Sequence, residues 1–484
     1  MAWSSLAGLL LLLVACSDDA IVVVGLAKPV EYEYHSFVAS PLAPHAYTAP
    51  ATAADALEDA AVSSPSALQV HLVHRDSFAV NASAADLLAR RLQRDERRAA
   101  WIITKAATPS DPENGTVVTG APTSGEYIAK ITVGTPYEND SSFEALLAPD
   151  MGSDVTWIQC MPCFRCYHQS GPVYNRLNSS SASDVGCYAP ACRALGSSGG
   201  CIQFLNECQY KAEYGDGSST AGDFGIETLT FAPGVRVPDV AIGCGSDNQG
   251  LFPAPVEGIL GLGRGSLSFP SQIAGRYGRS FSYCLASVRP HSSSALTFGS
   301  GATVTTPPAS FTPMLTNPRM YTFYYVRLVG ISVGGVRVPG VTESDLRLDP
   351  STGHGGVIVD SGTAMTRLAD PAYTAFRDAF RVAAVKDLGW PSPGGPFGFF
   401  DTCYSSVRGR VKLPAVSMHF AGGVEVKLPP QNYLIPVDSK GTMCFAFAGS
   451  GDRGVSIIGN IQLQGFCVVY DVDGQRVGFA PNCC

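Results

Sequence analysis

Two stretches of the sequence each place an aspartate at the start of a tight glycine turn. The first is LLAPDMGSDVTWI, around Asp150, and the second is GVIVDSGTAMTRL, around Asp360. In both, apolar residues lead to the aspartate, a glycine follows two positions later, and a hydroxyl residue comes next. A single Asp-x-Gly-Ser is most often only a β-turn, because Asp and Gly favour turns. Its repetition in matching surroundings points instead to two equivalent carboxylates.

Two carboxylates that lie close together could carry out acid–base chemistry on a water molecule. Like charges at short range cannot both ionise easily, so such a pair retains one proton. The ionised member could then accept a proton from water while the protonated member donates one to a substrate carbonyl. This chemistry would hydrolyse an amide without a covalent intermediate.

The surroundings of each aspartate repeat as well. About a hundred residues after each one come two aliphatic residues and a glycine, in GILGLG at 258–263 and in SIIGN at 456–460. The units of solenoid proteins are only about 20 to 50 residues long. The longer repeat here predicts two similar lobes, connected through FGSGATVTTPPASFTP, that bring the two turns together.

The elements that must position these turns are mostly short strands. From about residue 122 the sequence consists of apolar runs separated by glycine and proline, such as GEYIAKITVGTP, GIETLTFAPGV and GFCVVYDVDGQRVGFAP. Alternating Val, Ile, Tyr, Phe and Thr between turn residues indicate strands and hairpins. In this part of the chain, only residues 370–386 have a convincing amphipathic helical pattern. The body is therefore predicted to be mostly β.

The segment before residue 122 has a different character. Residues 28–66 are rich in Ala, Pro and Ser without a steady period, which predicts a linker or poorly ordered chain. LQVHLVHRDSF predicts a short strand, and SAADLLARRLQRDERRAAWIITK predicts a helix. The apolar residues at helical spacing are Leu87, Leu88, Leu92, Ala99 and Ile102. The arginines between them indicate either a solvated basic face or an inhibitory prosegment whose cations cover acidic groups of the body.

The start of the chain and its cysteines indicate export. The apolar run from Leu6 to Val14 is too short to span a bilayer and predicts a secretory signal at residues 1–25, with a lipid-modified Cys16 as the alternative. Fourteen further cysteines, an even number, favour a disulfide framework in an exported chain. Four sequons predict glycosylation at Asn81, Asn114, Asn139 and Asn178.

Other function classes have less support. More than half of the net charge of -8 lies in the first 115 residues, so the body offers no obvious nucleic-acid or anionic-membrane surface. The C-terminal GFAPNCC lacks the apolar tail of a lipid-anchor signal. CMPCFRC followed by His168 has the spacing of a zinc site, but no second Cys or His pair completes it. No G-x-S-x-G elbow indicates a serine hydrolase, and we predict no metal and no cofactor.

Several motifs occur together in the order typical of one protease family. They are GEYIAKITVGTP, DMGSDVTWIQC, YGDGSSTAGDFGIETLTF, GILGLGRGSLSFPSQ, FSYCL, YYVRLVGISVGG, VIVDSGTAMTRL, SIIGNIQLQGFCVVYD and RVGFAP. From about Leu68 to Cys484 the sequence resembles the pepsin-like aspartic peptidases, and within that family the plant nepenthesin-type branch. The resemblance implies an all-β fold of two barrel-like lobes, related by a pseudo-twofold axis, with a substrate cleft between them.

The resemblance also implies roles for individual residues. Asp150 and Asp360 match the catalytic pair, and the substrate would be a polypeptide bound extended across the cleft. Tyr214 matches the tyrosine of a hairpin flap, and Trp157 matches the cleft aromatic that supports it. The residues that support the two turns are Gly152, Ser153, Ser361, Gly362 and Thr363. The stretch from Cys160 to Cys208 resembles the disulfide-bonded insertion of the nepenthesin branch.

The first turn departs from the family pattern at two positions. The usual triplet is Asp-Thr-Gly, whose threonine hydroxyl bonds to the opposite turn; Met151 lacks that hydroxyl, whereas Ser361 retains one. We expect the lost hydrogen bond to cost about 0.5–1.5 kcal/mol and the larger side chain roughly 1–3 kcal/mol. Pro149 has no N–H, so its strand is expected to lose a ladder donor. These changes affect positioning and remove no reacting group.

Together these observations predict an aspartic endopeptidase that is made as a proenzyme and acts in acid. We predict a prosegment at 26–115, an N-terminal lobe with the Cys-rich insertion at 116–305, and a C-terminal lobe at 306–484. The protein would be a monomer, secreted to the exterior or cell wall or held in the vacuole, with polypeptide substrates, no nucleic-acid partner and no membrane anchor. A weakened enzyme, or an inactive binding protein similar to plant xylanase inhibitors, is the alternative. Disulfide connectivity stays open except for a predicted Cys467–Cys483 bridge.

Overall fold

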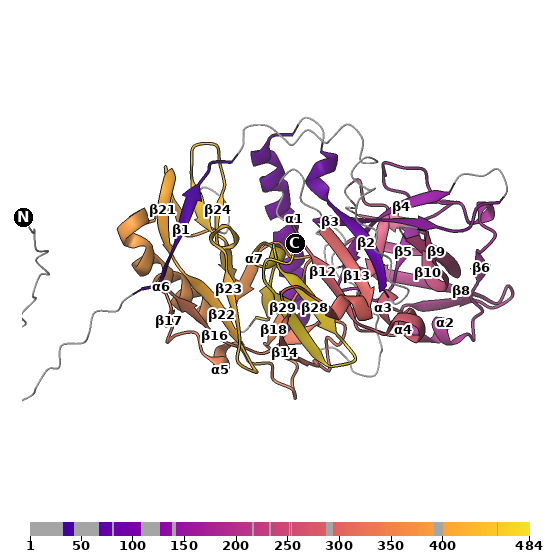
Figure 1. Ribbon diagram of the computed structural model, residues 1–484. Coiled ribbons are helices and arrows are strands. Elements are labelled where there is room, and N and C mark those ends of the chain that lie inside the picture. The colour runs from indigo at the N-terminus through magenta and orange to yellow at the C-terminus, as the bar shows by residue number, and fades with distance from the viewer. Residues whose placement is uncertain are drawn as a thin grey trace, which may run out of the picture. The chain divides into compact units, whose positions relative to one another are not determined.

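The computed structural model describes most of the chain from Tyr32 to the C-terminus (Figure 1). The described residues are 32–42, 67–79, 82–107, 126–137, 142–214, 217–231, 234–250, 252, 254–286, 294–391, 400–452 and 454–484. The predicted signal peptide at 1–25 and the sequons at Asn81, Asn114 and Asn139 lie outside them. Asn178 is described, and its side chain is exposed, so glycosylation there stays a prediction. In this part of the chain, no helix has the length and apolarity needed to cross a membrane.

The described residues form many short strands and few helices. The helices are α1 (Ala84–Ala107), α2 (Pro190–Ala194), α3 (Phe269–Gln272), α4 (Ala274–Tyr277), α5 (Glu343–Leu346), α6 (Asp370–Leu388) and α7 (Asn460–Leu463). Short 3-10 turns are η1 (Arg75–Phe78), η2 (Arg176–Asn178), η3 (Ser300–Thr303) and η4 (Pro430–Asn432). The helix expected at 370–386 is α6.

The strands up to the middle of the chain belong to the N-terminal segments and the N-terminal lobe. They are β1 (Tyr34–Ala39), β2 (Ala67–His74), β3 (Tyr127–Val133), β4 (Phe143–Asp150), β5 (Trp157–Gln159), β6 (Ser183–Asp184), β7 (Gly199–Ile202), β8 (Glu207–Glu213), β9 (Ser219–Phe231), β10 (Val235–Gln249), β11 (Gly258–Gly261), β12 (Phe281–Cys284) and β13 (Ser294–Gly299). Hairpin β9–β10 makes the most extensive pairing of this lobe.

The remaining strands belong to the C-terminal lobe. They are β14 (Ser310–Leu315), β15 (Tyr325–Val326), β16 (Leu328–Val333), β17 (Val336–Arg337), β18 (Val357–Val359), β19 (Thr366–Leu368), β20 (Cys403–Tyr404), β21 (Gly409–Pro414), β22 (Val416–Phe420), β23 (Val424–Leu428), β24 (Leu434–Pro436), β25 (Met443–Phe445), β26 (Phe447–Gly449), β27 (Ser456–Ile458), β28 (Cys467–Asp471) and β29 (Arg476–Ala480). Alternation of buried and exposed residues is clear in β23, where Val424, Val426 and Leu428 face the core.

Each lobe contains the same arrangement of strands beside its aspartate. In the N-terminal lobe, β4 ends at Asp150 and pairs in parallel with β11, which also pairs antiparallel with β5. In the C-terminal lobe, β18 leads to Asp360 and pairs in parallel with β27, which also pairs antiparallel with β19. β11 and β27 are formed by the GILGLG and SIIGN segments. The internal repeat predicted from the sequence is therefore confirmed.

An antiparallel sheet joins the two lobes, and Figure 1 shows several of its strands side by side. Its strand order is β3, β2, β13, β12, β28, β29 and β14. β28 and β29 come from the end of the chain, whereas β12 and β13 come from its middle. The prediction of an all-β fold with two lobes is confirmed.

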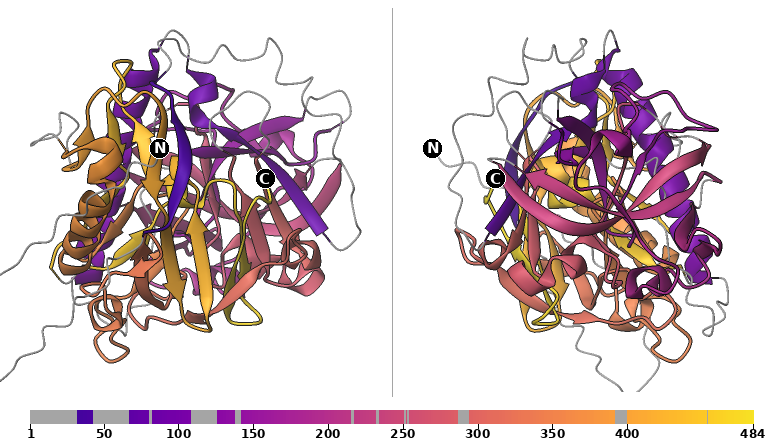
Figure 2. Two further views of the ribbon diagram at one scale, coloured as in Figure 1. Left: turned by 60° about the vertical axis from the view of Figure 1, so that its left-hand side comes forward. Right: turned by 90° about the vertical axis from the view of Figure 1, so that its right-hand side faces the viewer.

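The expectation for residues 28–66 was wrong at one place. Tyr34–Ala39 form strand β1, which pairs along its whole length with β21 of the C-terminal lobe (Figure 2). The backbone of Glu33 extends this contact, because its N–H donates to Gly334 O at 2.7 Å and its carbonyl accepts from Ala415 N–H at 2.9 Å. Pairing with a strand far along the chain therefore orders this segment, which its local composition alone does not predict.

Helix α1 confirms the helix that the spacing of apolar residues predicts. Ser83 begins it with a capping box, in which Asp86 N–H donates to Ser83 Oγ at 3.1 Å and Ser83 N–H donates to Asp86 Oδ2 at 3.3 Å. The apolar side of α1 packs on the body through buried side chains, namely Leu87, Leu88, Leu92, Ala99, Ile102 and Ala106. The helix is therefore attached to the body and is not a solvated basic helix.

Seven disulfides link all fourteen cysteines of the described residues. The pairs are Cys160–Cys244, Cys163–Cys166, Cys187–Cys201, Cys192–Cys208, Cys284–Cys484, Cys403–Cys444 and Cys467–Cys483. The predicted Cys467–Cys483 bridge is confirmed. Three of the bonds, Cys163–Cys166, Cys187–Cys201 and Cys192–Cys208, lie within the Cys-rich stretch after β5, and Cys284–Cys484 fastens the end of the chain beside β12.

Candidate active site

The first turn holds the carboxylate of Asp150 from both sides. Gly152 N–H donates to its Oδ1 at 3.0 Å, and Ser153 Oγ–H donates to its Oδ2. The last two residues of the GILGLG segment, just after β11, fix the turn. Leu262 N–H donates to Asp150 O at 2.9 Å, and Gly263 N–H donates to Ser153 O at 2.8 Å. Asp150 is buried, so its position is set by these bonds and not by solvent.

The second turn repeats this pattern around Asp360. Gly362 N–H donates to Oδ1 at 3.3 Å, and Thr363 Oγ1–H donates to Oδ2 at 2.6 Å. Asp360 N–H donates to Ile458 O at 3.1 Å, and Asn460 N–H donates to Thr363 O at 2.8 Å. The structure thus gives the predicted supporting residues equivalent positions on both turns.

A single cation from α1 bridges the two carboxylates. Nη2 of Arg98 donates to Asp150 Oδ1 and to Asp360 Oδ1 at 2.7 Å each, and its Nε donates to Asp360 Oδ2 at 2.7 Å. One nitrogen therefore contacts both carboxylates. The close approach needs a glycine in the second turn, because a β-carbon on Gly362 would lie 2.5 Å from Cζ of Arg98.

The ion pairs outweigh the effect of burial on these groups. Burial raises the pKa of Asp360, but the charge of Arg98 and the hydrogen bonds to the carboxylate leave that pKa below its ordinary value. Burial lowers the pKa of Arg98, but the two carboxylates raise it above its ordinary value. A buried charge that loses its partner is strongly destabilising, so the three groups depend on one another.

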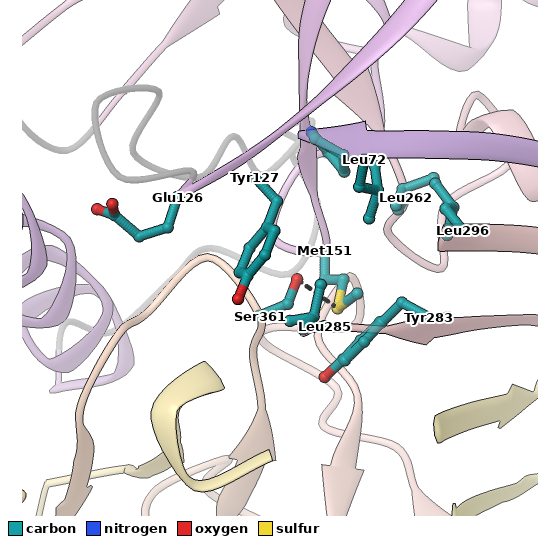
Figure 3. A pocket seen from close by; sticks show the side chains of 10 residues that line it. Leu72, Glu126, Tyr127, Met151, Leu262, Tyr283, Leu285, Leu296 and Ser361 are labelled. Carbon is teal, nitrogen blue, oxygen red and sulfur yellow. Dashed lines mark hydrogen bonds between the residues drawn. The ribbon is translucent and has the colours of Figure 1, made fainter. Parts of the chain in front are cut away.

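The two turns also touch directly, through Met151 and Ser361. Ser361 Oγ donates to the sulfur of Met151 at 3.4 Å (Figure 3). Asn460 Nδ2 donates to Ser361 O at 2.9 Å and fixes the second turn from behind. This contact agrees with the expectation that half of the link between the turns is missing: the methionine donates nothing, and the remaining hydroxyl donates to a weak sulfur acceptor.

Pro149 does not interrupt the sheet as expected. Asp150 O accepts from Leu262 N–H, so the polar groups of Asp150 face β11 and those of Pro149 face the other side. On that side the pairing of β4 with β3 ends at the Leu147–Ala129 pair. No ladder donor is lost at Pro149. It instead lines a cavity of about 10 Å³ beside Met151, close to the smallest space that holds one water molecule.

The sequence and the fold match those of known plant proteins. Residues 127–300 match the model described as xylanase inhibitor N-terminal, and residues 323–481 match the one described as xylanase inhibitor C-terminal. Aspartyl protease family protein 2 of Arabidopsis thaliana is 48% identical over 435 residues, which is 87% of this chain and 86% of that protein. The chain belongs to the pepsin-like aspartic proteases. Its plant nepenthesin-type branch, expected from the motifs, is confirmed by a further relative, aspartic proteinase nepenthesin-1.

Two further relatives bear on the family and its fold. Aspartic proteinase nepenthesin-1 of Nepenthes gracilis is 38% identical over 418 residues, which is 86% of this chain and 90% of that protein. The crystal structure of edgp superposes with a TM-score of 0.62 at 20% identity and covers 86% of this chain and 95% of that one. The second likeness supports the fold alone.

Tyr214, the tyrosine expected on the flap, and Trp157, the aromatic expected to support it, are in contact in the N-terminal lobe. Tyr214 follows β8, and its hydroxyl accepts a hydrogen bond from Nε1 of Trp157 on β5. Phe252 packs edge-on against Trp157, with ring centroids 5.3 Å apart, and stacks on Tyr167 at 4.7 Å. The expected contact between Tyr214 and Trp157 is present, and the motion of a flap stays a prediction.

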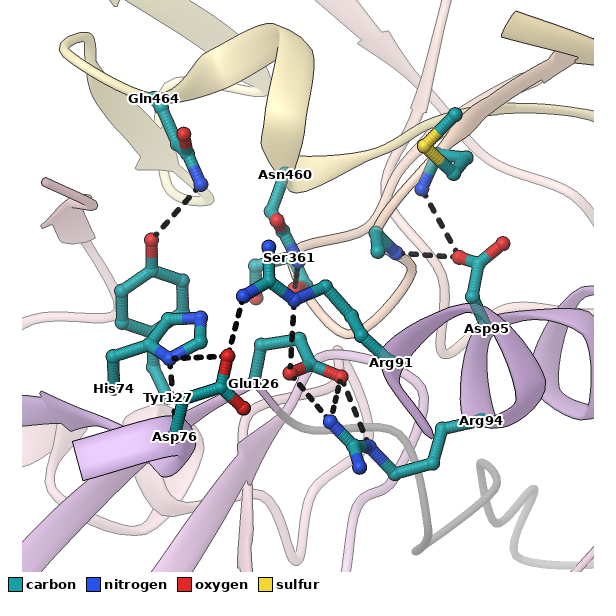
Figure 4. A network of polar contacts seen from close by, with 12 residues as sticks. His74, Asp76, Arg91, Arg94, Asp95, Glu126, Tyr127, Ser361, Asn460 and Gln464 are labelled. Atoms are coloured by element: carbon teal, nitrogen blue, oxygen red, sulfur yellow. Dashed lines mark hydrogen bonds and ion pairs between the residues drawn. The ribbon is translucent and has the colours of Figure 1, made fainter. Parts of the chain in front are cut away.

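A buried network of charges attaches α1 to Asp76 of the preceding segment and to Glu126 of the N-terminal lobe (Figure 4). Arg91 Nη2 donates to Asp76 Oδ2 at 2.6 Å, and Arg94 Nη2 donates to both carboxylate oxygens of Glu126 at 2.8 and 2.9 Å. Burial raises the pKa of Glu126, but Arg94 and Arg91 lower it to about 2. Burial is also the main reason that the pKa of His74 falls to about 4. The network therefore contains a neutral histidine at neutral pH.

Sequence reasoning missed which residues of α1 reach the site. It found the basic run but not that Asp95 and Arg98 point inward. The signal was present, because both lie on the stripe that contains Leu88, Leu92 and Ile102 at spacings of three and four. A charged residue on an apolar stripe is expected to find a buried partner.

Sequence reasoning also missed Asp154, the acidic residue directly after the first turn. Its Oδ1 accepts from Thr322 Oγ1–H at 2.6 Å and from Gly265 N–H at 2.8 Å. The GLGRG segment at 261–265 forms a turn around this carboxyl. A β-carbon on Gly265 would lie 2.4 Å from Cγ of Asp154, so the loop approaches closely only because glycine stands there.

Proposed function

We propose that this protein is an aspartic endopeptidase in which Asp150 and Asp360 activate a water molecule for attack on a peptide bond. The observation that carries the proposal is that one nitrogen, Nη2 of Arg98, lies 2.7 Å from an oxygen of each carboxylate. A water at that position, once the arginine has left, would contact both carboxylates. The relatives named aspartic proteases support the same chemistry.

The geometry of the two turns supports distinct roles for the carboxylates. Without the arginine, two buried carboxylates at this range would share a proton, because both cannot ionise easily. The ionised oxygen accepts a proton from the water, while the protonated carboxyl donates to the substrate carbonyl. The hydrogen bonds from Gly152, Ser153, Gly362 and Thr363 keep the two groups facing the same point. The retained proton makes acid the working range.

We also propose that the protein is made as a proenzyme with its prosegment at 26–115. Arg98 fills the place of the water, and α1 covers the two turns, so a substrate could not reach the carboxylates. The mature enzyme would then consist of lobes 116–305 and 306–484. The predicted signal at 1–25 and the seven disulfides favour the secretory route, to the exterior, the cell wall or the vacuole.

The test is cleavage of a denatured protein by the acid-treated full-length protein between about pH 3 and 5. Cleavage inhibited by pepstatin and lost in both Asp150→Ala and Asp360→Ala would support the proposal. Asp452→Ala is the matched control, because Asp452 is an exposed residue of the C-terminal lobe far along the chain from both turns. Cleavage that persists in both active-site variants would overturn the proposal.

A second function has support from Met151 and from the xylanase-inhibitor family models. In this case the protein would bind another protein through surface loops without cutting it, because the weak Met151–Ser361 contact would hold the two turns less firmly than a bond between two hydroxyl groups. An error of about 1 Å in position can cost on the order of a hundredfold in rate. A silent wild type together with an active Met151→Thr variant would favour this function.

A further inference from the structure

Helix α1 places a carboxylate, as well as a guanidinium, on the loop that follows Asp360. Oδ1 of Asp95 accepts from the backbone N–H groups of Ala364 at 2.6 Å and Met365 at 3.0 Å. Its Oδ2 accepts from Nη2 of Arg367 at 2.7 Å. Figure 4 shows the side chain of Asp95 pointing from the helix toward these hydrogen-bond donors. Asp95 is 1% exposed and Arg367 is 6% exposed, so the contact is buried.

This loop is a carboxylate-binding site by its chemistry. Two N–H groups converge on one oxygen and a guanidinium binds the other, and hydrogen bonds to a charged group are among the strongest in proteins. If Asp95 left and these donors stayed buried without another acceptor, each unpaired donor would cost free energy. Another carboxylate in the place of Asp95 would meet the same three donors.

The site does not depend on α1 for its shape. Thr366 N–H donates to Gln462 Oε1 at 2.9 Å, and Gly459 N–H donates to Thr366 Oγ1 at 3.1 Å. Ile461 N–H donates to Ala364 O at 3.0 Å. β19, which contains Arg367, pairs with β26 and β27. These partners all belong to the C-terminal lobe, so we expect the donors to keep their places when α1 leaves.

The site lies close to the reacting carboxylates. Asp95 and Arg98 are three residues apart on α1, which is a rise of about 4.5 Å along the helix. Arg98 contacts the Asp150–Asp360 pair while Asp95 contacts the loop. An extended substrate advances about 3.3 Å per residue. The carboxylate site is therefore within reach of a side chain about one to three residues from the bond that is cut.

We propose that, once α1 has left, the Ala364–Met365–Arg367 site binds the side-chain carboxylate of a Glu or Asp in the substrate. In the uncut chain, Asp95 then lies where the acidic side chain of the substrate would bind. The consequence is a protease that prefers an acidic side chain at one position near the cut. This inference rests on the proposed endopeptidase function and adds its substrate class.

The experiment compares peptides that differ by a single acidic side chain. Internally quenched peptides with one apolar cleavage site carry Glu or Gln at each position up to about three residues on either side of the cut. The acid-activated full-length protein is assayed near pH 5, where a Glu of ordinary pKa about 4.3 is mostly ionised. We expect one position at which Glu raises kcat/KM at least about tenfold over Gln. The preference should shrink at about pH 3, where Glu is protonated.

Variants then assign the preference to Arg367. In Arg367→Gln the ratio of kcat/KM for the Glu and Gln peptides should fall to about one, whereas the exposed control Arg347→Gln keeps it. If Arg367→Gln does not fold, the double variant Asp95→Asn with Arg367→Gln replaces the buried ion pair by a neutral hydrogen-bonded pair and is assayed in its place. Cleavage with no acidic preference, or with a preference that survives the loss of Arg367, overturns this inference and leaves the proposed function standing. No cleavage of any peptide overturns both.

Discussion

The hydroxyl of Ser361 donates to the sulfur of Met151, so the two active-site turns are joined by one weak hydrogen bond between the lobes. Sulfur is a weak acceptor, and the methionine offers no donor in return. Met151 is also 1% exposed and lines the small cavity with Leu72 and Tyr283, so its side chain fills space that a shorter residue would leave open. Alignment of the turns therefore favours a hydroxyl side chain at position 151, whereas packing behind the turns favours a large apolar one.

Replacing Met151 by threonine should separate these two demands. A threonine hydroxyl can both donate and accept, so Met151→Thr should raise kcat on a protein substrate by aligning the turns. The same change removes buried atoms and should cost about 1–3 kcal/mol of stability. The measurements are steady-state kinetics and the thermal midpoint. Met151→Leu, which fills similar space without a hydroxyl, is the control, and a rise in kcat in that variant would contradict the explanation.

Removing the charge of Arg98 should weaken the attachment of α1. Arg98→Gln leaves two buried carboxylates without their cation, which typically costs about 3–5 kcal/mol. We expect the full-length chain to be processed near pH 5 at least about tenfold faster than wild type, measured as the loss of the intact band with time. Arg90→Gln, an exposed arginine on the same helix, is the matched control. Equal rates for Arg98→Gln and wild type would show that the arginine does not restrain the helix.

The sequence was sufficient for features whose signal is local or repeated. The turns at Asp150 and Asp360 were found because the same residue types recur in the same order, and α1 was found because its apolar residues keep a helical period. Strand β1 was not found, because its order comes from pairing with β21 far along the chain. The expected loss of a ladder donor at Pro149 was wrong for a related reason. Whether the missing N–H matters depends on where the pairing of β4 with β3 ends.

The charged contacts of the site could be predicted only in kind. A basic run indicates that cations seek acidic partners, but several arginines compete for that role. Only Arg98 reaches the aspartate pair, while Arg91 and Arg94 bind Asp76 and Glu126. The helical phase would have placed Asp95 and Arg98 on the buried side, but not their partners, because those partners come from lobes whose placement is a property of the whole fold.

His74 should make the packing of α1 sensitive to acid. Its pKa of about 4 is lowered chiefly by burial and then by Arg91, with Arg94 adding to this and Asp76 and Glu126 opposing it. Because the folded pKa lies below the ordinary 6.5, its contribution to stability is complete above about pH 6.5 and is lost as the pH falls toward 4. The loss is roughly 3 kcal/mol in full.

The predicted response of His74 to acid can be checked by proteolysis of the proform. The carboxylate of Glu126 keeps its charge until about pH 2, so His74 responds to acid before Glu126 does. We expect the wild-type segment around α1 to become sensitive to an added protease as the pH falls from 6.5 to 4, and His74→Gln to show a flatter dependence. His168→Gln, an exposed histidine outside the network, should behave as wild type. Identical curves for wild type and His74→Gln would assign the response to other groups.

The carboxyl of Asp154 should contribute more to the stability of the folded state in acid than near neutrality. Burial raises its pKa to about 6 against the hydrogen bonds from Thr322 and Gly265, and within the described residues its Oδ2 has no hydrogen-bond partner. A carboxyl whose folded pKa lies above its ordinary 3.8 favours the folded state when protonated. That contribution is therefore lost as the pH rises from about 4 to 6, by up to roughly 3 kcal/mol. Asp154→Asn keeps the oxygen acceptor and does not titrate, so the stability of wild type relative to Asp154→Asn should fall as the pH rises from about 4 to 6. A difference between the two denaturation midpoints that stays constant over this range would show that Asp154 does not contribute this pH dependence.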